Sequence, residues 1–343
     1  MSFEFALSVF CLLLFAFPMS PTPHTLLCDP ALAFLAPALT PAWVGSRLGE
    51  VLGRSLSLRA IRPLRHKLGR RCLIAYDIEL AGEVVTVVGK VRSRGLDHHS
   101  YELQRKLWHH GFEDASADGV SVPEPLGVMP ELHLWLQRWV PGRVATELLP
   151  QDVGLAERIA GAIAKLHRAN IPARKCHTPA DEIRILQERL PRVAQIHPQW
   201  QERIEHVLQA SAALAKTLPQ AATTGIHRDF YPDQVLVSGD RLYLLDLDLY
   251  CQGDPALDIG NFVAHLSEQS LRRFGHPDAF TQQETALVEA FCKLDSQVSR
   301  GAIATYKTLT LVRHIYISTQ HPHRRATTAP LLSLCEARLA QGP

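Results

Sequence analysis

The sequence lacks any Cys-x-x-Cys pair, and its seven cysteines are widely scattered and odd in number. This pattern favours neither a disulfide framework nor a zinc site, and it fits a reducing compartment. The formal net charge of the 343 residues is only +2, which is too small to indicate a nucleic-acid-binding protein. Internal repeats and low-complexity tracts are also missing, so we expect a compact chain large enough for two lobes.

The sequence also lacks a hydrophobic run of the length that a membrane-spanning helix needs. The run at residues 5–17 has the length of a signal-peptide core, but Glu4 precedes it and the first basic residue is Arg47. It fits a weak signal or anchor, a buried N-terminal helix, or an upstream extension ahead of Met19. We favour the last two, treat 1–45 as an N-terminal extension, and expect membrane contact only if this segment is retained.

Alternating and β-branched segments predict a small antiparallel sheet with one helix in residues 46–141. The expected strands are 56–64, 72–80, 83–91, 120–129 and 132–140, and the expected helix is 99–111. From residue 142 to 343 the apolar spacing is helical, interrupted by a hairpin of 235–237 and 242–245. The sequence therefore predicts an α+β protein of two lobes, the second mainly helical, with a ligand cleft between them.

The hairpin is unusually rich in carboxylates. Asp246 and Asp248 are two residues apart and so leave the strand on one face, and Asp229 can fold back beside its end. Two carboxylates about 5 Å apart repel by roughly 3 kcal/mol at an effective dielectric constant near 20. A divalent cation removes that repulsion, and Mg²⁺ prefers oxygen ligands. The alternative is that the carboxylates point into water, which suits Asp233 and Asp240 in their turns.

The spacing of these residues favours the metal site. The stretch HRDFYPDQ fits the pattern H-x-D-x-x-x-x-[N/Q], and twelve residues after Gln234 comes Asp246. A phosphoryl-transfer site needs this order: one Asp to orient the acceptor hydroxyl, an amide oxygen on a metal, and a second Asp on the metal and phosphates.

These residues resemble a known fold. His227-Arg228-Asp229 with Asp246 resembles the protein-kinase-like fold, and GDPALDIGNF (253–262) is similar to the aminoglycoside phosphotransferase and choline kinase superfamily. The resemblance covers about residues 45–320, with its specific part at 225–262. It implies a bilobal protein-kinase-like fold, a small-molecule kinase, and the cofactors ATP and Mg²⁺.

The resemblance also implies roles for single residues. It makes Asp229 the catalytic residue and Asp258 a brace of the catalytic loop. Asp254 is left open between a helix cap and a functional role. The implied metal ligands and the supporting residues of this region are Gln234, Asp246, Asp248, His227, Asp254 and Asp258.

In the small lobe, the third strand should carry a lysine for the nucleotide phosphates, and the next helix a glutamate to hold it. Lys90 and Glu102 stand in that order. The segment from Gln137 to Trp139 resembles the hinge that meets adenine, although Trp139 fits core packing equally well. The loop RHKLGRR (65–71) lies where a phosphate-covering loop is expected, but it has no G-x-G-x-x-G.

We therefore expect an ATP- and Mg²⁺-dependent phosphotransferase acting on a hydroxyl of an aminoglycoside-, amino-alcohol- or sugar-like molecule in the cytoplasm. Gln234, where asparagine is usual, moves the amide oxygen about 1.5 Å further from the backbone and favours a second hypothesis, a nucleotide-binding regulatory pseudo-enzyme. A protein kinase ranks lower, because neither D-F-G nor A-P-E occurs. The oligomeric state stays open.

Overall fold

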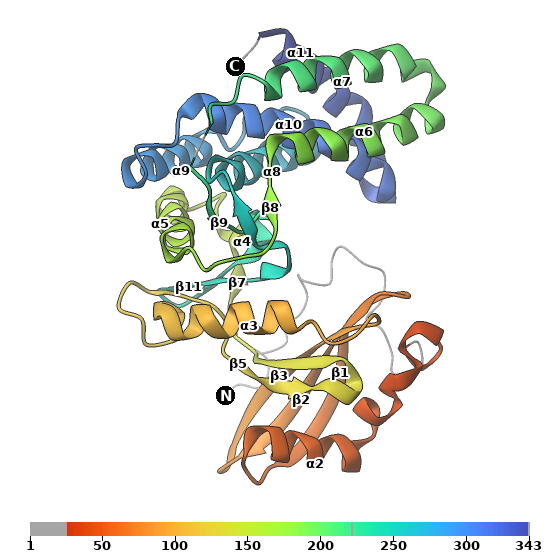
Figure 1. The fold of residues 1–343 in the computed structure, drawn as a ribbon, viewed down its shortest axis with the longest axis vertical. Coiled ribbons are helices and arrows are strands. Elements are labelled where there is room, and N and C mark those ends of the chain that lie inside the picture. Colours follow the sequence, from red (N-terminus) through yellow and green to blue (C-terminus); the bar gives the residue numbers. More distant parts are fainter. Residues whose placement is uncertain (1–25, 221, 342–343) are drawn as a thin grey trace. The chain divides into compact units, whose positions relative to one another are not determined.

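The computed structural model describes residues 26–220 and 222–341, which fold as two units (Figure 1). Of the described residues, the first unit comprises those up to Arg143 together with Val237–Leu245. The second comprises the other described residues, from Val144 to Leu236 and from Asp246 onward. The predicted hydrophobic segment at 5–17 lies outside the described residues.

The first unit is built on a five-stranded antiparallel sheet with the strand order β1-β2-β3-β6-β5. Its strands are β1 (Ser57–Lys67), β2 (Arg71–Leu80), β3 (Glu83–Arg92), β5 (Pro125–Met129) and β6 (Leu134–Arg138). Helix α3 (His98–Leu107) follows β3 and is capped by the Asp97 carboxylate, which accepts a hydrogen bond from the Ser100 amide at 3.1 Å. The predicted five strands and one helix are thus present.

The first unit also contains residues that we had assigned to an N-terminal extension. A 3-10 segment (Pro30–Leu39) and helix α2 (Pro41–Leu52) pack their apolar side chains into the same core as β2 and β3. Leu26, Leu35 and Leu48 are fully buried there. The predicted boundary at residue 45 is therefore wrong for the described part. The apolar residues before residue 45 follow neither a continuous run nor a strict period, so the sequence did not show that they cover the sheet.

The acidic hairpin belongs partly to the first unit. It consists of β10 (Val235–Ser238) and β11 (Arg241–Leu244), and β11 pairs in parallel with the short strand β4 (Val120–Ser121). The Arg241 guanidinium donates to the Ser116 carbonyl at 3.0 Å. The predicted assignment of all residues after 141 to one helical lobe therefore misses this return of the chain.

The second unit is mainly helical, as predicted. Its helices are α4 (Ala145–Leu148), α5 (Val153–Ala169), α6 (Pro179–Ile196), α7 (Gln201–Ala215), α8 (Ala256–Phe274), α9 (Thr281–Leu294), α10 (Arg300–Gln320) and α11 (Thr328–Gln341). Helix α10 packs against α8 and α6, and α5 packs against α9 (Figure 1). Helix α6 begins with a capping box in which Thr178 and Asp181 satisfy each other's backbone amides.

A small three-stranded sheet in the second unit was not predicted. It has the order β8-β12-β9, formed by Cys176–His177, Cys251–Gly253 and Thr224–Ile226. Strands of two or three residues carry too little periodicity to be recognised in a sequence. This sheet matters for the site because β9 leads directly into His227. Among the described residues, no helix is both long and apolar enough to cross a membrane.

Candidate active site

The predicted catalytic segment is a loop that leaves β9 and ends in a 3-10 turn at Pro232–Gln234. His227 and Phe230 are fully buried and anchor the loop, with their ring centroids 5.6 Å apart. Asp229, which lies between them, is half-buried. Its carboxylate forms no hydrogen bond or ion pair with any residue that the structure describes, so it is available to a ligand.

Asp258, in the first turn of α8, holds the backbone of this loop. Its carboxylate accepts hydrogen bonds from the His227 amide at 2.8 Å and the Arg228 amide at 2.7 Å. His167 Nε2, from α5, lies 2.8 Å from the same carboxylate. Arg228 has a φ of +69°, a left-handed conformation that costs a non-glycine residue roughly 1–2 kcal/mol. Charge-assisted hydrogen bonds to Asp258 offset that strain.

Asn261, one turn further along α8, holds the other end of the loop. Its side-chain amide donates to the Phe230 carbonyl at 2.8 Å and is 1% exposed. A single helix therefore holds the backbone of the residues before and after Asp229. Asn261 was not predicted, although its spacing of three residues from Asp258 places both on one helix face. His167 was not predicted either, because nothing in its local sequence connects it to a residue 91 positions away.

Asp246 and Asp248 do not leave the hairpin as residues of a continuing strand. Strand β11 ends at Leu244, Asp246 adopts a left-handed conformation with φ +51°, and Asp248 lies in a 3-10 turn at Leu247–Leu249. The prediction that the two aspartates share one strand face is therefore wrong. Leu247 is buried whereas Leu249 is exposed, so residues two apart in this segment do not share a face. A left-handed aspartate at a strand end aims its carboxylate differently from its neighbours and fits a functional position.

The predicted ligand set suits a hard cation. Gln234 is only 7% exposed, and its side-chain amide forms no hydrogen bond within the described part of the chain. An amide oxygen that no protein donor engages can accept a cation, so this oxygen is a candidate ligand. Within residues 26–220 and 222–341, three His, Cys, Asp or Glu side chains do not meet at one point. Mg²⁺ commonly takes only one or two carboxylates, with water and substrate phosphates completing its shell.

The predicted pairing of Lys90 with Glu102 is not formed. Glu102 forms an ion pair with Arg105 on the exposed side of α3, with 2.8 Å between Oε2 and Nη2, and this guanidinium lowers the pKa of the Glu102 carboxyl. Lys90 instead lies with its ammonium 4.7 Å from the centroid of the Trp135 ring. The helical phase of α3 explains the error, because its buried face presents Gln104 instead of Glu102.

The predicted hinge lies at the end of β6. The Trp139 amide donates to the Thr86 carbonyl at 3.0 Å and the Arg138 amide to the Glu124 carbonyl at 2.9 Å. An adenine ring would therefore have to meet other backbone groups of this segment. Gln137 accepts a hydrogen bond from Gln104 at 3.2 Å, and Trp139 is half-buried, so it does not belong to the closed core.

Asp254 lies just before α8. Its carboxylate accepts a hydrogen bond from the Ala256 amide at 2.9 Å, which is the contact expected of a capping residue. Burial raises the pKa of this carboxyl above its ordinary value. The predicted turn residue Asp233 accepts a hydrogen bond from the Thr146 hydroxyl and is exposed.

The comparisons with known proteins point to one family. The model of the phosphotransferase enzyme family matches residues 97–287. A search of curated proteins finds no match. Among solved structures, the chain is similar to a choline/ethanolamine kinase family protein from Mesorhizobium loti, with 15% identity and a TM-score of 0.54, covering 82% of this chain and 88% of that one.

Two further structures agree. A thermostable mutant of the aminoglycoside phosphotransferase APH(4)-Ia, in ternary complex with ADP and hygromycin B, has 17% identity and a TM-score of 0.58, covering 87% of this chain and 98% of that one. Choline kinase from Cryptosporidium parvum Iowa II has 11% identity and a TM-score of 0.56, covering 90% and 94%. The predicted bilobal kinase-like fold and the superfamily resemblance are confirmed.

Proposed function

The chain belongs to the phosphotransferase enzyme family, and from this premise we propose that it transfers the γ-phosphoryl group of ATP to a hydroxyl group of a small molecule. The observation that carries the proposal is the loop around Asp229. Asp258 and Asn261 fix its backbone on both sides, while the Asp229 carboxylate is not engaged by any described residue. A rigid backbone with an available carboxylate is what orienting an acceptor hydroxyl requires.

In this proposal Asp229 accepts a hydrogen bond from the acceptor hydroxyl and takes its proton as the new oxygen–phosphorus bond forms. The transition state of phosphoryl transfer is loose, so the position of the carboxylate matters more than its basicity. The structure supports this emphasis, because the fully buried Asp258 carboxylate holds Arg228 in its strained backbone conformation next to Asp229.

Gln234 and Asp246, assisted by Asp248, would hold Mg²⁺. When bound, the ion supplies positive charge to the phosphate oxygens. Asp246 has the left-handed backbone of a specialised position, and Gln234 has a side-chain amide without a hydrogen-bond partner among the described residues. These two observations support the ligand assignment.

Lys90 would contact the nucleotide phosphates without help from Glu102. Its ammonium is already positioned against Trp135, which can take over the orienting role that we first gave to the glutamate. The structures that this fold resembles are described as choline, ethanolamine, aminoglycoside and glucosamine kinases. We propose a small hydroxylated molecule of that range as the acceptor.

The test is ATP consumption by the purified chain with a panel of amino alcohols, amino sugars and aminoglycosides. Asp229→Asn should remove acceptor-dependent turnover, whereas Asp278→Asn, an exposed aspartate outside the loop, should leave it unchanged. General-base removal typically lowers turnover by about 100- to 10,000-fold. Equal rates for wild type and Asp229→Asn would refute the proposal.

Gln234 supports a second candidate, a nucleotide-binding pseudo-enzyme. Its side chain is one methylene longer than that of the asparagine usual at this position, so the amide oxygen lies further from the backbone than a ligand set built for asparagine requires. Mg²⁺-dependent ATP binding without phosphate release to any acceptor would favour this candidate. Activity that appears only in Gln234→Asn would show that the glutamine is the reason.

A further inference from the structure

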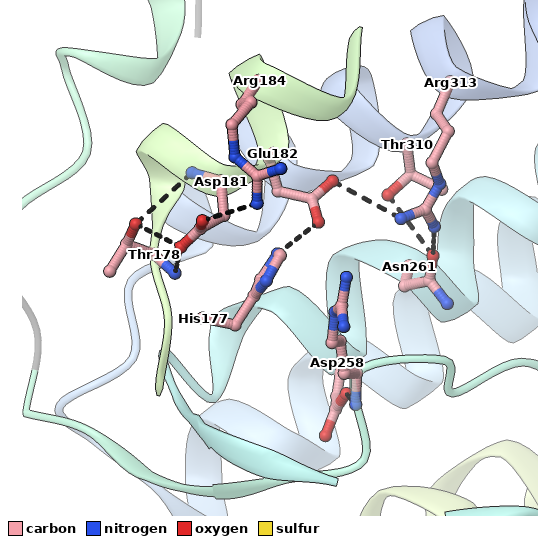
Figure 2. Close-up of polar contacts among 10 residues, drawn as sticks. His177, Thr178, Asp181, Glu182, Arg184, Asp258, Asn261, Thr310 and Arg313 are labelled. Atoms are coloured by element: carbon pink, nitrogen blue, oxygen red, sulfur yellow. Dashed lines mark hydrogen bonds and ion pairs between the residues drawn. The ribbon is translucent and has the colours of Figure 1, made fainter. Parts of the chain in front are cut away.

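A series of polar contacts runs from α6 to Asn261 on α8 (Figure 2), and Asn261 in turn holds the loop that carries Asp229. His177 Nε2 lies 2.6 Å from Glu182 Oε1, and Arg313 Nη1 donates to Glu182 Oε2 at 3.4 Å. Arg313 Nη2 donates to Asn261 Oδ1 at 2.5 Å, and Asn261 Nδ2 donates to the Phe230 carbonyl at 2.8 Å. The contacts thus end on the carbonyl of Phe230, the residue that follows Asp229.

The charges in this series of contacts are withdrawn from water. Glu182 is 1% exposed and the Arg313 side chain 12%. Burial alone raises the pKa of Glu182, but the Arg313 guanidinium and the His177 hydrogen bond outweigh it and lower the pKa to about 2. A buried ion pair contributes little net stability compared with apolar residues, but breaking one partner is strongly destabilising. We therefore look for the role of this ion pair in the groups that it holds in position.

Arg313 decides which way the Asn261 amide points. A guanidinium can only donate, so it must face the Asn261 oxygen, and Asn261 then presents its NH₂ group to the Phe230 carbonyl. The Thr310 hydroxyl, 3.4 Å from the same oxygen, adds a second donor. Without these donors the amide could turn over and place its oxygen against the Phe230 carbonyl, where two acceptors repel.

We propose that Arg313, anchored by Glu182, is a positioning residue for phosphoryl transfer: it fixes the Asn261 amide, which holds the Phe230 carbonyl and thereby the Asp229 carboxylate. This inference rests on the proposed function of Asp229. It assigns α6 a part in the reaction through Glu182, although Glu182 lies 47 residues before Asp229 in the sequence.

A purely structural role for Arg313 would be to hold α6 against α10, which pack together in any case. The two roles differ in one respect. A positioning residue acts through Asp229, so its effect depends on that carboxylate, whereas a structural residue affects turnover whether Asp229 is present or not.

The experiment is a double-mutant cycle of Arg313→Lys with Asp229→Asn, measured as single-turnover transfer of labelled phosphate. Lysine keeps the charge but cannot bond Glu182 and Asn261 in the same fork. In the wild-type background we expect the rate to fall by about 10- to 100-fold, the loss typical of a remote misplacement of about 1 Å. In the Asp229→Asn background we expect a further loss of less than about twofold, because coupled sites are not additive.

The matched control is Arg184→Lys, an exposed arginine of α6 paired with Asp181, which should change neither rate. The ATP dissociation constant should be the same in Arg313→Lys and wild type. Because the substitution weakens a buried ion pair, all rates are measured well below the thermal midpoint of unfolding of each variant. If Arg313→Lys does not fold, Glu182→Gln replaces it in the same cycle with the same expected outcome.

An equal loss in both backgrounds overturns the positioning role while the proposed function stands. A rate for Asp229→Asn equal to wild type is seen before the cycle is completed, and it overturns the proposed function and this inference together.

Discussion

Replacing Glu182 by glutamine should lower the stability of the second unit by an amount that depends on pH. The carboxyl has an ordinary pKa of 4.5, and in the folded protein Arg313 and His177 lower it to about 2 despite the opposing effect of burial. A difference of about 2.5 pKa units corresponds to about 3 kcal/mol of folding free energy at neutral pH. The glutamine variant has no ionisable group at this position and cannot gain that stabilisation.

The sign of the pH dependence follows from the depressed pKa. The contribution of Glu182 is complete above pH 5 and is lost as the pH falls toward 2, because the unfolded chain then binds a proton that the folded chain does not. The difference between wild type and Glu182→Gln should therefore fall to about 2 kcal/mol at pH 3.5.

Urea unfolding, followed by far-ultraviolet circular dichroism at neutral pH and at pH 3.5, measures both differences. Glu188→Gln is the matched control: the same residue type on α6, exposed and paired with Arg184, so its effect should stay below about 1 kcal/mol at both pH values. A Glu182→Gln effect that is no larger than that of the control, or that grows as the pH falls, would refute the reasoning.

Three further changes probe the site. Asp258→Asn should reduce turnover by about 100-fold, since an amide cannot accept all three hydrogen bonds, and the far-ultraviolet spectrum should show whether the fold is retained. Gln234→Asn should strengthen apparent Mg²⁺ affinity by about 10-fold in a titration of ATP turnover, and weaker affinity would contradict the view that glutamine is the departure. Lys90→Met should weaken ATP binding by about 10-fold or more in calorimetry, with Glu102→Gln within about twofold; the reverse order would restore the pair that the structure does not form.

The sequence predicted the elements of the fold better than their grouping. Strands with clear alternation and helices with apolar periodicity lie where expected, because both patterns arise from one buried face. The boundary at residue 45 failed because burial of Leu26 and Leu35 depends on a sheet formed later in the chain. The sequence did not show the return of Val237–Leu245 to the first unit for the same reason, because the partner strand lies far away in the sequence at Val120–Ser121.

The candidate site divides in the same way. The motif around Asp229 and the helix that begins after Asp254 could be recognised, because their residues are close together in the sequence. The conformation of Asp246 could not be recognised, because the alternating pattern carries no signal that the strand ends at Leu244, two residues before Asp246. Arg313 contacts Glu182 and Asn261, and these three residues come from three different helices. Only the packed structure shows these contacts.

The central claim is that Asp229 orients a small-molecule hydroxyl for phosphoryl transfer. The most direct measurement is acceptor-dependent ATP turnover by Asp229→Asn against wild type, with Mg²⁺ and the acceptor found in the panel. We expect turnover to fall by at least about 100-fold while ATP still binds with unchanged affinity. Turnover within about twofold of wild type would contradict the account.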